Sequence, residues 1–391
     1  MKLFNSIKIS SLLFASSCLI ISACNKAPLE PEPIVLPAQA VSPTLASLLD
    51  NNEFSFFKAA VIKAGLLPNL ASTTARYTVF APTNSAFILS GIPSVDVINS
   101  LPTATLAGLI SYHIVPQTLL AQNISETFPN YEYPTVLNPT TGTAGFNPLL
   151  RLTTYPSRRG AGAWVNNIPV TETNVNAVNG VLHKVYTLIS PPSKYLWDSI
   201  SESSDLTYLK AAVIRADSGV VVAGRLQTAL SSFGVNLTIL APTNLAFQTM
   251  LTRSIYLVLV RQGMPAATAY PTAQYLASTP DVFSNPALYG ALSSQNVKGI
   301  LLYHILGTSI PGIRVFSVNL PTTTTSIKTL LNKDVAAQAT FTGPFVGAAT
   351  FKGAANPTAS KVIINPLNPF ATDQNYINGV IMKIDQVLLP Q

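Results

Sequence analysis

Few residues of this chain could carry out chemistry. The three histidines, His113, His183 and His304, are too far apart in the sequence to have the spacing of a metal site. A Gly-x-Ser-x-Gly elbow, a His-Glu-x-x-His pair, a phosphate-binding glycine loop and a carboxylate-rich calcium loop are all missing from the sequence. With 16 acidic residues spread over the chain, a catalytic carboxylate pair is a weak hypothesis. We therefore expect no enzyme, no metal and no cofactor.

The second cysteine is the residue with the clearest chemical role. A short basic region precedes an apolar stretch at 9–21, which is short for a membrane span. The sequence Ile21-Ser22-Ala23-Cys24 that follows resembles the lipobox of bacterial lipoproteins. The resemblance implies a signal peptide over 1–23 and a membrane contact through lipid on Cys24. The alternative is an ordinary secretory signal in which this cysteine lies near the cut. Cys18 falls inside the removed segment, so we expect no disulfide.

Composition fits an exported protein that does not bind nucleic acid. The chain has 391 residues, of which 48% are hydrophobic and only 10% charged. Its net charge is +7, and removing Lys2 and Lys8 with the signal leaves +5. Arg158 and Arg159 form the only adjacent arginine pair, and no basic run exists. We expect no nucleic-acid partner, whereas weak attraction to an anionic polysaccharide stays open.

Three sequence blocks occur twice in the same order, which predicts a tandem duplication. They are TVFAPTNSAF at 78–87 and TILAPTNLAF at 238–247, YHIV at 112–115 and YHIL at 303–306, and NGVLHKV at 179–185 and NGVIMKI at 378–384. A proline-rich stretch at 24–42 indicates an extended tether. We divide the remainder into a first repeat, 43–192, and a second repeat, 193–391.

The first block indicates a strand followed by a capped helix. Residues 78–81 are β-prone, and the proline after them ends the strand. Thr83 or Asn84 is expected to cap the short helix that follows, and Thr243 or Asn244 to do the same in the second repeat. A longer helix with apolar residues at helical spacing is expected before this strand in each repeat.

The third block predicts a β-hairpin. Asn179-Gly180 and Asn378-Gly379 each lie between β-prone runs, and this dipeptide favours a tight turn with positive φ. The strand after it alternates, and we expect one of its faces to be the core face: Val181, His183 and Val185 in the first repeat, and Val380, Met382 and Ile384 in the second.

The second repeat carries an insertion at about 252–290. The interval from Phe87 to Tyr112 is 25 positions, and the interval from Phe247 to Tyr303 is 56. The apolar run at 255–260 indicates either a packed helix or lid, which we favour, or an exposed contact surface.

Together, the three blocks resemble the fasciclin-like domain family over nearly all of the chain after the tether. The resemblance implies an α+β domain, in which a wedge or sandwich of β-strands carries several small helices. It also implies an extracellular or surface-attached role in adhesion, without shared catalytic machinery. Met382 in place of His183, Gly307 in place of Pro116, and the insertion depart from the family pattern.

The Tyr-His pairs allow two interpretations. Tyr112-His113 and Tyr303-His304 could mark the adhesive surface, as proposed for the equivalent dipeptide of the family. In the structural interpretation, which we favour, the histidine ends a helix and hydrogen-bonds the Thr-Asn turn as a satisfied buried group. For His183, a core-facing side chain is expected.

The sequence thus predicts a lipid-anchored cell-envelope protein that works in adhesion or ligand binding. Its expected ligand is a surface protein or polysaccharide, contacted mainly by the insertion of the second repeat. Asn25 after the cysteine favours an outer-membrane lipoprotein, periplasmic or surface-exposed. The alternatives are a glycan-binding accessory of a polysaccharide-uptake system and a structural envelope-assembly protein. The oligomeric state stays open.

Overall fold

The computed structural model describes residues 42–126, 130–307, 314–365, 368, 370 and 372–390, which belong to one compact unit. Cys24, the predicted signal peptide and the tether lie outside the described residues. None of the described helices is long and apolar enough to cross a membrane.

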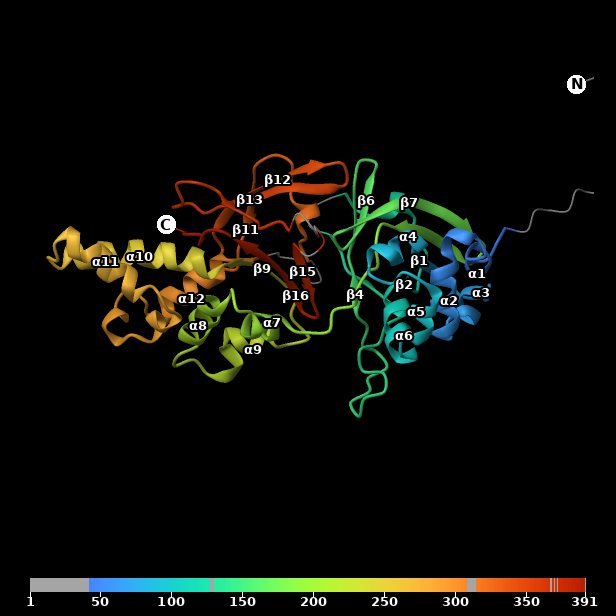
Figure 1. The fold of residues 1–391 in the computed structure, drawn as a ribbon, viewed down its shortest axis with the longest axis horizontal. Helices are drawn as coiled ribbons and strands as arrows, with labels where there is room; N and C mark the ends of the chain where they lie inside the picture. The colour runs from blue at the N-terminus through green and yellow to red at the C-terminus, as the bar shows by residue number, and fades with distance from the viewer. Residues whose placement is uncertain are drawn as a thin grey trace, which may run out of the picture. The chain divides into compact units, whose positions relative to one another are not determined.

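The first repeat combines short helices with short strands (Figure 1). Its helices are α1 (Leu45–Leu48), η1 (Asn52–Phe54), α2 (Ser55–Lys63), α3 (Leu67–Ala71), α4 (Asn84–Leu89), α5 (Val95–Ser100), α6 (Thr103–Tyr112) and η2 (Ala121–Asn123). Its strands are β1 (Tyr77–Pro82), β2 (Ile114–Val115), β3 (Tyr133–Pro134), β4 (Thr153–Thr154), β5 (Pro156–Arg159), β6 (Gly162–Val165), β7 (Ile168–Ala177) and β8 (Gly180–Val185). Six of the strands form a sheet in the order β2-β1-β8-β7-β6-β5.

The second repeat contains more helix and a second full sheet. Its helices are α7 (Leu196–Glu202), α8 (Thr207–Ala216), η3 (Val222–Gly224), α9 (Leu226–Leu230), α10 (Asn244–Arg261), α11 (Ala266–Leu276), η4 (Pro280–Ser284), η5 (Pro286–Leu288), α12 (Ser294–Tyr303) and η6 (Ser317–Asn319). Its strands are β9 (Leu237–Pro242), β10 (Ile305–Leu306), β11 (Thr325–Lys328), β12 (Asp334–Thr342), β13 (Phe345–Lys352), β14 (Ser360–Lys361), β15 (Asp373–Tyr376) and β16 (Gly379–Ile384).

The strand pairing confirms the duplication. The order β2-β1-β8-β7 in the first repeat matches β10-β9-β16-β15 in the second. In both, the strand of the first sequence block runs parallel to the strand of the third, with Tyr77 opposite Gly180 and Leu237 opposite Gly379. The repeats differ in their other strands: β5 and β6 extend the sheet of the first, whereas β11–β14 form a separate sheet in the second. The α+β class is confirmed.

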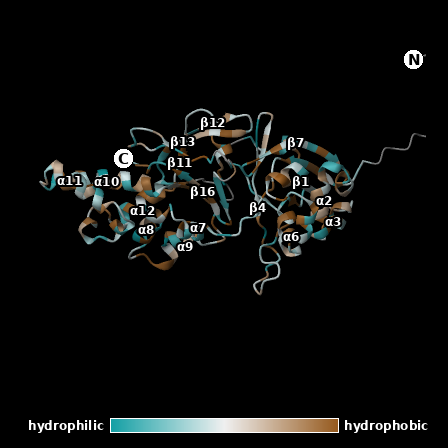
Figure 2. Ribbon diagram, viewed as in Figure 1, coloured by the Kyte–Doolittle hydropathy of each residue, from teal (hydrophilic) through white to brown (hydrophobic). Residues whose placement is uncertain are grey.

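The predicted core face of the central strand is buried in both repeats, and the opposite face, which was not expected to be, is buried too. Leu182 packs in the cluster formed by α2, α5 and α6, whereas Val185 packs in a separate cluster on the other side of the sheet. In the second repeat, Ile381 faces the helices, and Met382 faces the core between the two sheets. A strand covered on both sides shows no polar–apolar alternation. Along the ribbon, apolar segments recur on both the helices and the strands (Figure 2).

The predicted hairpins are confirmed, and Gly180 has the expected positive φ, at 148°, whereas Gly379 is not among the glycines with positive φ. Ala177 pairs with Gly180, so the turn residues are Val178 and Asn179, and the glycine opens the next strand. A Cβ on Gly180 would lie 1.9 Å from the carbonyl oxygen of Tyr77. The same substitution at Gly379 would place a Cβ 2.3 Å from the carbonyl oxygen of Leu237. Glycine is therefore needed for the close approach of the parallel strand.

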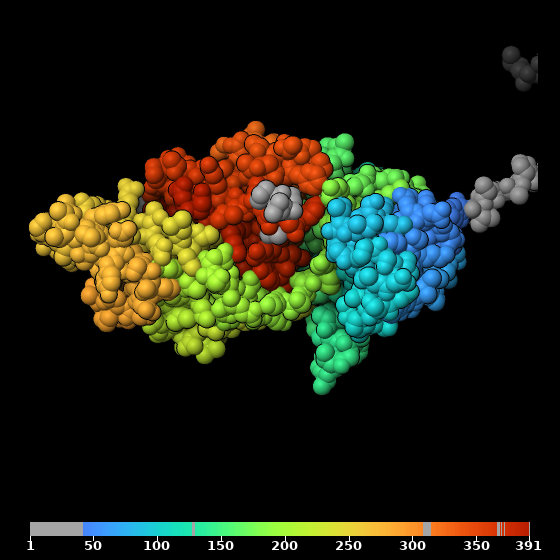
Figure 3. Space-filling view, in the orientation of Figure 1, coloured from blue at the N-terminus to red at the C-terminus, as the bar shows by residue number. Residues whose placement is uncertain are grey.

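The insertion is helical. Helix α10 has 18 residues where its counterpart α4 has six, and α11 packs against it. Ile255 of the predicted apolar run is buried, whereas Leu257 and Val260 remain 43% and 39% exposed. The run is therefore a half-packed helix, with one face toward the core and the other toward solvent. Figure 3 shows the insertion, yellow to orange, standing out from the strands of its own repeat.

Candidate functional site

The Tyr-His pair of the first repeat lies in the interior. Tyr112 and His113 are both fully buried at the end of α6. The tyrosine hydroxyl donates to the carbonyl of Thr153 at 2.9 Å. His113 Nδ1 bonds the carbonyl of Leu109 at 2.8 Å, and Nε2 accepts from the backbone N–H of Ile189 at 3.0 Å. These partners place the proton on Nδ1 and join the helix to the segment after β8.

The second repeat reproduces this arrangement. Tyr303 donates to the carbonyl of Asp334 at 2.6 Å. His304 Nδ1 bonds the carbonyl of Ile300 at 2.8 Å, and Nε2 accepts from the N–H of Leu388 at 2.8 Å. Burial lowers the pKa of both histidines to about 4. Protonation of Nε2 would remove the acceptor that the backbone N–H needs, so the neutral form is the structural one.

These contacts favour the structural interpretation of the pairs. Side chains with no exposed surface cannot meet a partner directly, which argues against the adhesive interpretation of Tyr112, His113, Tyr303 and His304. The structural interpretation fits, but its expected hydrogen-bond partner was wrong. Each histidine bonds a backbone N–H near the end of its repeat and not the Thr-Asn turn.

The threonine and the asparagine of the Thr-Asn turn each bond the start of a different helix. Thr83 accepts from the N–H of Ala86 at 3.4 Å and so caps its own helix, as predicted. Asn84 instead accepts from the N–H of Phe56 at 3.0 Å, at the start of α2. Thr243 caps α10 in the same way, accepting from the N–H of Ala246. Its neighbour Asn244 accepts from the N–H of Tyr208 at 3.2 Å, at the start of α8. The turn thus connects α4 to α2 in the first repeat and α10 to α8 in the second through hydrogen bonds.

The asparagine of each Asn-Gly pair is buried and makes several hydrogen bonds to the backbone. Asn179 accepts from the N–H of Leu45 at 2.8 Å and donates to the carbonyls of Leu70 and Ser72. In the second repeat Asn378 accepts from the N–H of Leu196 at 2.9 Å and donates to the carbonyl of Leu230. The dipeptide therefore ties the hairpin to the first and third helices of its repeat. No surface role remains for it.

Side chains of the first repeat complete the core of the second. Tyr155 and Trp164 are buried in the cluster between the two sheets of the second repeat. Trp164 Nε1 donates to the carbonyl of Pro344 at 2.8 Å. Arg314 is 2% exposed; it donates to Asn236 and Asn375 and lies 4.7 Å from the ring centre of Tyr155. The printed hydrogen bonds of this arginine lie within the second repeat, and its cation–π contact with Tyr155 joins it to the first repeat.

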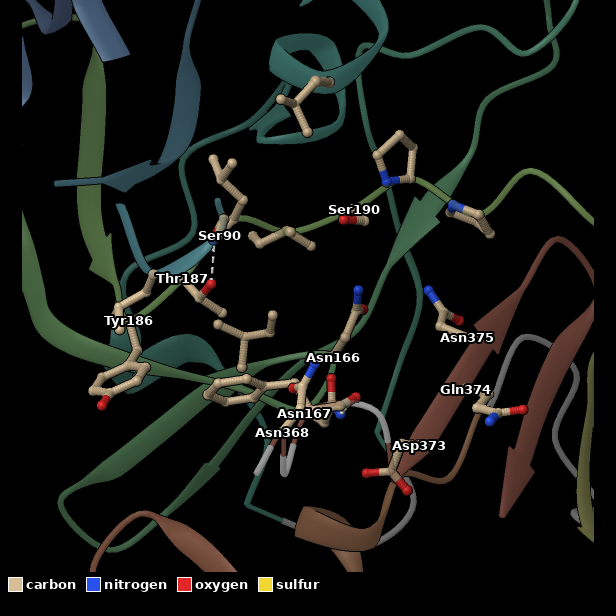
Figure 4. Close-up of a pocket in the computed structure, with 18 of the residues that line it drawn as sticks. Ser90, Asn166, Asn167, Tyr186, Thr187, Ser190, Asn368, Asp373, Gln374 and Asn375 are labelled. Atoms are coloured by element: carbon tan, nitrogen blue, oxygen red, sulfur yellow. Dashed lines mark hydrogen bonds between the residues drawn. The ribbon is translucent and has the colours of Figure 1, made fainter. Parts of the chain in front are cut away.

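A cleft of about 1010 Å³ opens between the repeats, and Figure 4 shows its walls. Asn166 and Asn167 come from the first repeat, and Gln374 and Asn375 from β15 of the second. Tyr186 contacts the rings of Phe345 and Phe370, at 5.4 and 5.8 Å between centres. Two of the amides bond across the junction: Asn167 donates to the carbonyl of Phe370 at 2.9 Å, and Asn375 donates to the hydroxyl of Tyr112 at 3.4 Å.

Among the described residues that line the cleft, Asp373 is the one acidic side chain. Burial raises its pKa to about 6, although Ser317 donates from both its N–H and its hydroxyl, at 3.1 and 2.6 Å. No second carboxylate and no histidine is found among the described residues that line the cleft. No group of three or more His, Cys, Asp or Glu side chains within the described ranges could hold a metal ion.

A comparison with family models identifies the family of the first repeat. The family model described as the Fasciclin domain matches residues 52–191. Residues 52–191 form a fasciclin domain. The match covers the first Thr-Asn, Tyr-His and Asn-Gly blocks. The second repeat has the same strand order and register, and its buried histidine and asparagine make the same backbone hydrogen bonds. It is therefore a second copy of the same fold.

Three named proteins are similar to part of this chain. Transforming growth factor-beta-induced protein ig-h3 of Sus scrofa is 29% identical over 164 residues, 39% of this chain and 20% of that protein. The ig-h3 protein of Oryctolagus cuniculus is 28% identical over 153 residues, 37% of this chain and 19% of its own. Protein sll1483 of Synechocystis is 28% identical over 152 residues, 38% of this chain and 74% of its own. The chain thus spans about a fifth of the ig-h3 proteins.

A solved structure aligns with most of the chain, but loosely. It is a FAS1 domain pair from the insect cell adhesion molecule fasciclin I, with 15% sequence identity and a TM-score of 0.34 over 87% of this chain and 98% of its own. A score this low adds nothing to the assignment. Fasciclin domains are associated with cell adhesion, and proteins that contain them are generally adhesion proteins rather than enzymes.

Sequence reasoning missed the residues that join the two fasciclin domains. Arg314, Tyr155 and Trp164 belong to no repeated block. Their partners lie far away in the sequence: Asn236 donates to Tyr155 across 81 residues, and Trp164 reaches Pro344 across 180. A single unpaired arginine within an apolar stretch was the one available signal, and it does not name a partner.

Proposed function

We propose that this chain is a lipid-anchored protein of the cell envelope that adheres to a surface ligand without catalysing a reaction. The observation that carries the proposal is the fasciclin domain at 52–191, since such domains are associated with adhesion. The interior position of the Tyr-His and Asn-Gly blocks and the half-buried position of the Thr-Asn turns support it further. These blocks build the domain, which leaves other residues on the surface to make contacts.

The insertion of the second fasciclin domain is the contact surface we favour. Apolar and aromatic side chains remain exposed on it, among them Leu257 and Tyr270, at 43% and 54%. Tyrosine is enriched at binding surfaces because its ring is large and its hydroxyl can hydrogen-bond. The first domain has no comparable element, because its α4 ends after six residues.

The adhesive role is tested by binding of the full-length protein in detergent to an array of glycans and matrix proteins. The expected result is saturable binding to one ligand class that persists at physiological salt, because contacts that are not purely electrostatic are weakly screened. A blank array, with the protein folded by circular dichroism, would contradict adhesion and favour a structural role in envelope assembly.

The anchor is tested separately by metabolic labelling with a radioactive fatty acid. The wild-type chain is expected to take up label and to sediment with membranes. Cys24→Ser removes the thiol that forms the thioether and is expected to abolish both. Cys18→Ser is the matched control and should leave labelling unchanged. An unlabelled wild-type chain would contradict the anchor and leave the adhesive proposal standing.

A further inference from the structure

A groove of about 720 Å³ runs along the insertion, between helices α10 and α11. One wall carries Leu245, Arg253 and Tyr256, and the other carries Tyr270 and Gln274. The rings of Tyr256 and Tyr270 meet edge to face, with centres 6.0 Å apart and an angle of 73°. All the lining residues lie within continuously described chain, and the volume falls in the range of ligand clefts.

The polar groups of this groove are free to bind a ligand. Among the described residues, the side chains of Arg253, Tyr256, Tyr270 and Gln274 make no hydrogen bond and no ion pair. Tyr270 is 54% exposed and Leu245 71% exposed, so the aromatic wall is open to solvent. Two phenol hydroxyls, an amide and a guanidinium therefore face an open apolar floor without protein partners.

The charge of the groove selects the kind of ligand. Arg253 contributes a positive charge, and no aspartate or glutamate lines the groove. A guanidinium pairs with a carboxylate through two parallel hydrogen bonds. A single arginine is too little for a phosphate backbone, which is bound through several cations. Tyrosine rings beside hydroxyl and amide groups suit a ring that is apolar on its faces and bears hydroxyls at its edge.

We propose that the groove between α10 and α11 binds a carboxylated polysaccharide chain, with a sugar ring packed on Tyr270 and a uronate carboxylate paired with Arg253. The inference deepens the proposed adhesive function by naming a site and a ligand class, and it rests on that function. The first fasciclin domain lacks this site because it lacks both the long helix and its partner.

The test measures binding of the full-length protein in detergent to polygalacturonate by titration calorimetry. Fully methyl-esterified polygalacturonate is the matched probe, since it keeps the backbone and removes the charge. Tyr270→Ala and Arg253→Gln alter the groove. Tyr275→Ala on α11 and Arg261→Gln on α10 are the controls, because both residues are exposed on the same helices and neither lines the groove.

The proposal expects each groove variant to weaken binding at least tenfold and each control to change it less than twofold. Wild-type protein should bind the esterified probe at least tenfold more weakly, and Arg253→Gln should lose this preference. Unchanged binding in both groove variants would overturn the proposal, as would equal losses in the controls, which indicate unspecific attraction.

The two proposals fail in distinguishable ways. If polygalacturonate is ignored while the array shows another ligand, adhesion stands and the uronate site is overturned. If Tyr270→Ala abolishes binding to a protein on the array, the groove takes a protein partner, and the saccharide proposal is overturned. A blank array overturns the adhesive function itself.

Discussion

In the first fasciclin domain, the segment that follows β2 is held by an amide and an imidazole. Asn174 accepts from the N–H of Ala121 at 2.8 Å, and His183 Nε2 bonds the carbonyl of Leu119 at 2.8 Å. In the second domain, Asp373 and Met382 occupy the corresponding places. Asp373 accepts from the N–H of Ser317, and Met382 packs in the apolar core.

Three positions change together in this comparison. Where the first domain has Asn174, Ala121 and His183, the second has Asp373, Ser317 and Met382. The hydroxyl of Ser317 supplies the carboxylate with a donor that Ala121 lacks. The comparison teaches that one backbone geometry is compatible with two buried polar sets, provided that each set satisfies its own hydrogen bonds.

The same segment differs in a second way that concerns the whole molecule. The equivalent threonines Thr78 and Thr238 accept from the N–H groups of Leu119 and Val315, which therefore occupy equivalent positions. The residues just before them, Thr118 and Arg314, then correspond to each other. Thr118 is exposed, whereas Arg314 is buried against Tyr155 of the first domain. The segment that only closes the first domain therefore also binds the second domain to the first.

The largest expected effect comes from removing this junction. Arg314→Met should lower the free energy of unfolding by about 3–5 kcal/mol, because the half-buried acceptors on Asn236, Asn375 and Tyr376 lose the donor that the buried guanidinium supplies. Urea denaturation measures the loss. Arg225→Met, at an exposed arginine, should change stability by less than about 0.5 kcal/mol. A loss below about 1 kcal/mol in Arg314→Met would contradict the role of this arginine in the junction.

The buried histidines test what the domains share. His113→Ala and His304→Ala should each cost about 3 kcal/mol, since each leaves a backbone N–H and a cavity behind. The folded-state pKa of about 4 lies below the unfolded value, so the neutral ring favours folding above pH 6.5. That contribution, roughly 3 kcal/mol per histidine, is lost as pH falls from 6.5 to 4. Urea titrations at several pH values should show a shallower acid decline in both variants. If the losses of unfolding free energy in His113→Ala and His304→Ala differed by more than about 1 kcal/mol, the two histidines would not have equivalent roles.

The sequence was sufficient for the parts that both copies repeat. Recurrence of the blocks predicted the duplication, the hairpins and the threonine caps, because each depends on residues close in sequence. It could not assign partners across space. Asn84 looked like a cap of its own helix and caps α2, and His113 was paired with the wrong segment, since a buried donor or acceptor does not reveal its partner. Arg314 and the groove beside Arg253 have no counterpart in the first repeat, so a comparison of the two repeats could not reveal them.

A smaller effect is expected when the first domain receives the side chain of the second. His183→Met should cost about 1–3 kcal/mol, because the N–H of Asn174 and the carbonyl of Leu119 lose a partner. Burial lowers the pKa of His183, so the variant should also lose less stability on acidification. Met382→Leu, which conserves volume, is the matched control and should cost less than about 1.5 kcal/mol. A variant as stable as wild type would show that the hydrogen bonds of the imidazole add nothing to the stability of the domain.

The smallest effect, and the one opposite in sign, is expected at Asp373. Its folded-state pKa of about 6 lies above the unfolded value, so the folded state binds this proton more tightly. The contribution is fully present below about pH 4 and is lost as pH rises through 6. Asp373→Asn gives the second domain the amide of the first, keeps an acceptor for the N–H of Ser317, and should gain about 1–2 kcal/mol at pH 7.

The pH profile separates this effect from a general change in packing. In wild type, protonation of Asp373 between pH 6 and 4 opposes the loss caused by the buried histidines, so Asp373→Asn should decline more steeply in that window. Asp334→Asn, at an exposed aspartate paired with Lys328, should leave the profile unchanged. If Asp373→Asn were less stable than wild type at pH 7, the two donors of Ser317 would outweigh the burial of the charge. The carboxylate would then stabilise the second domain, as the imidazole stabilises the first.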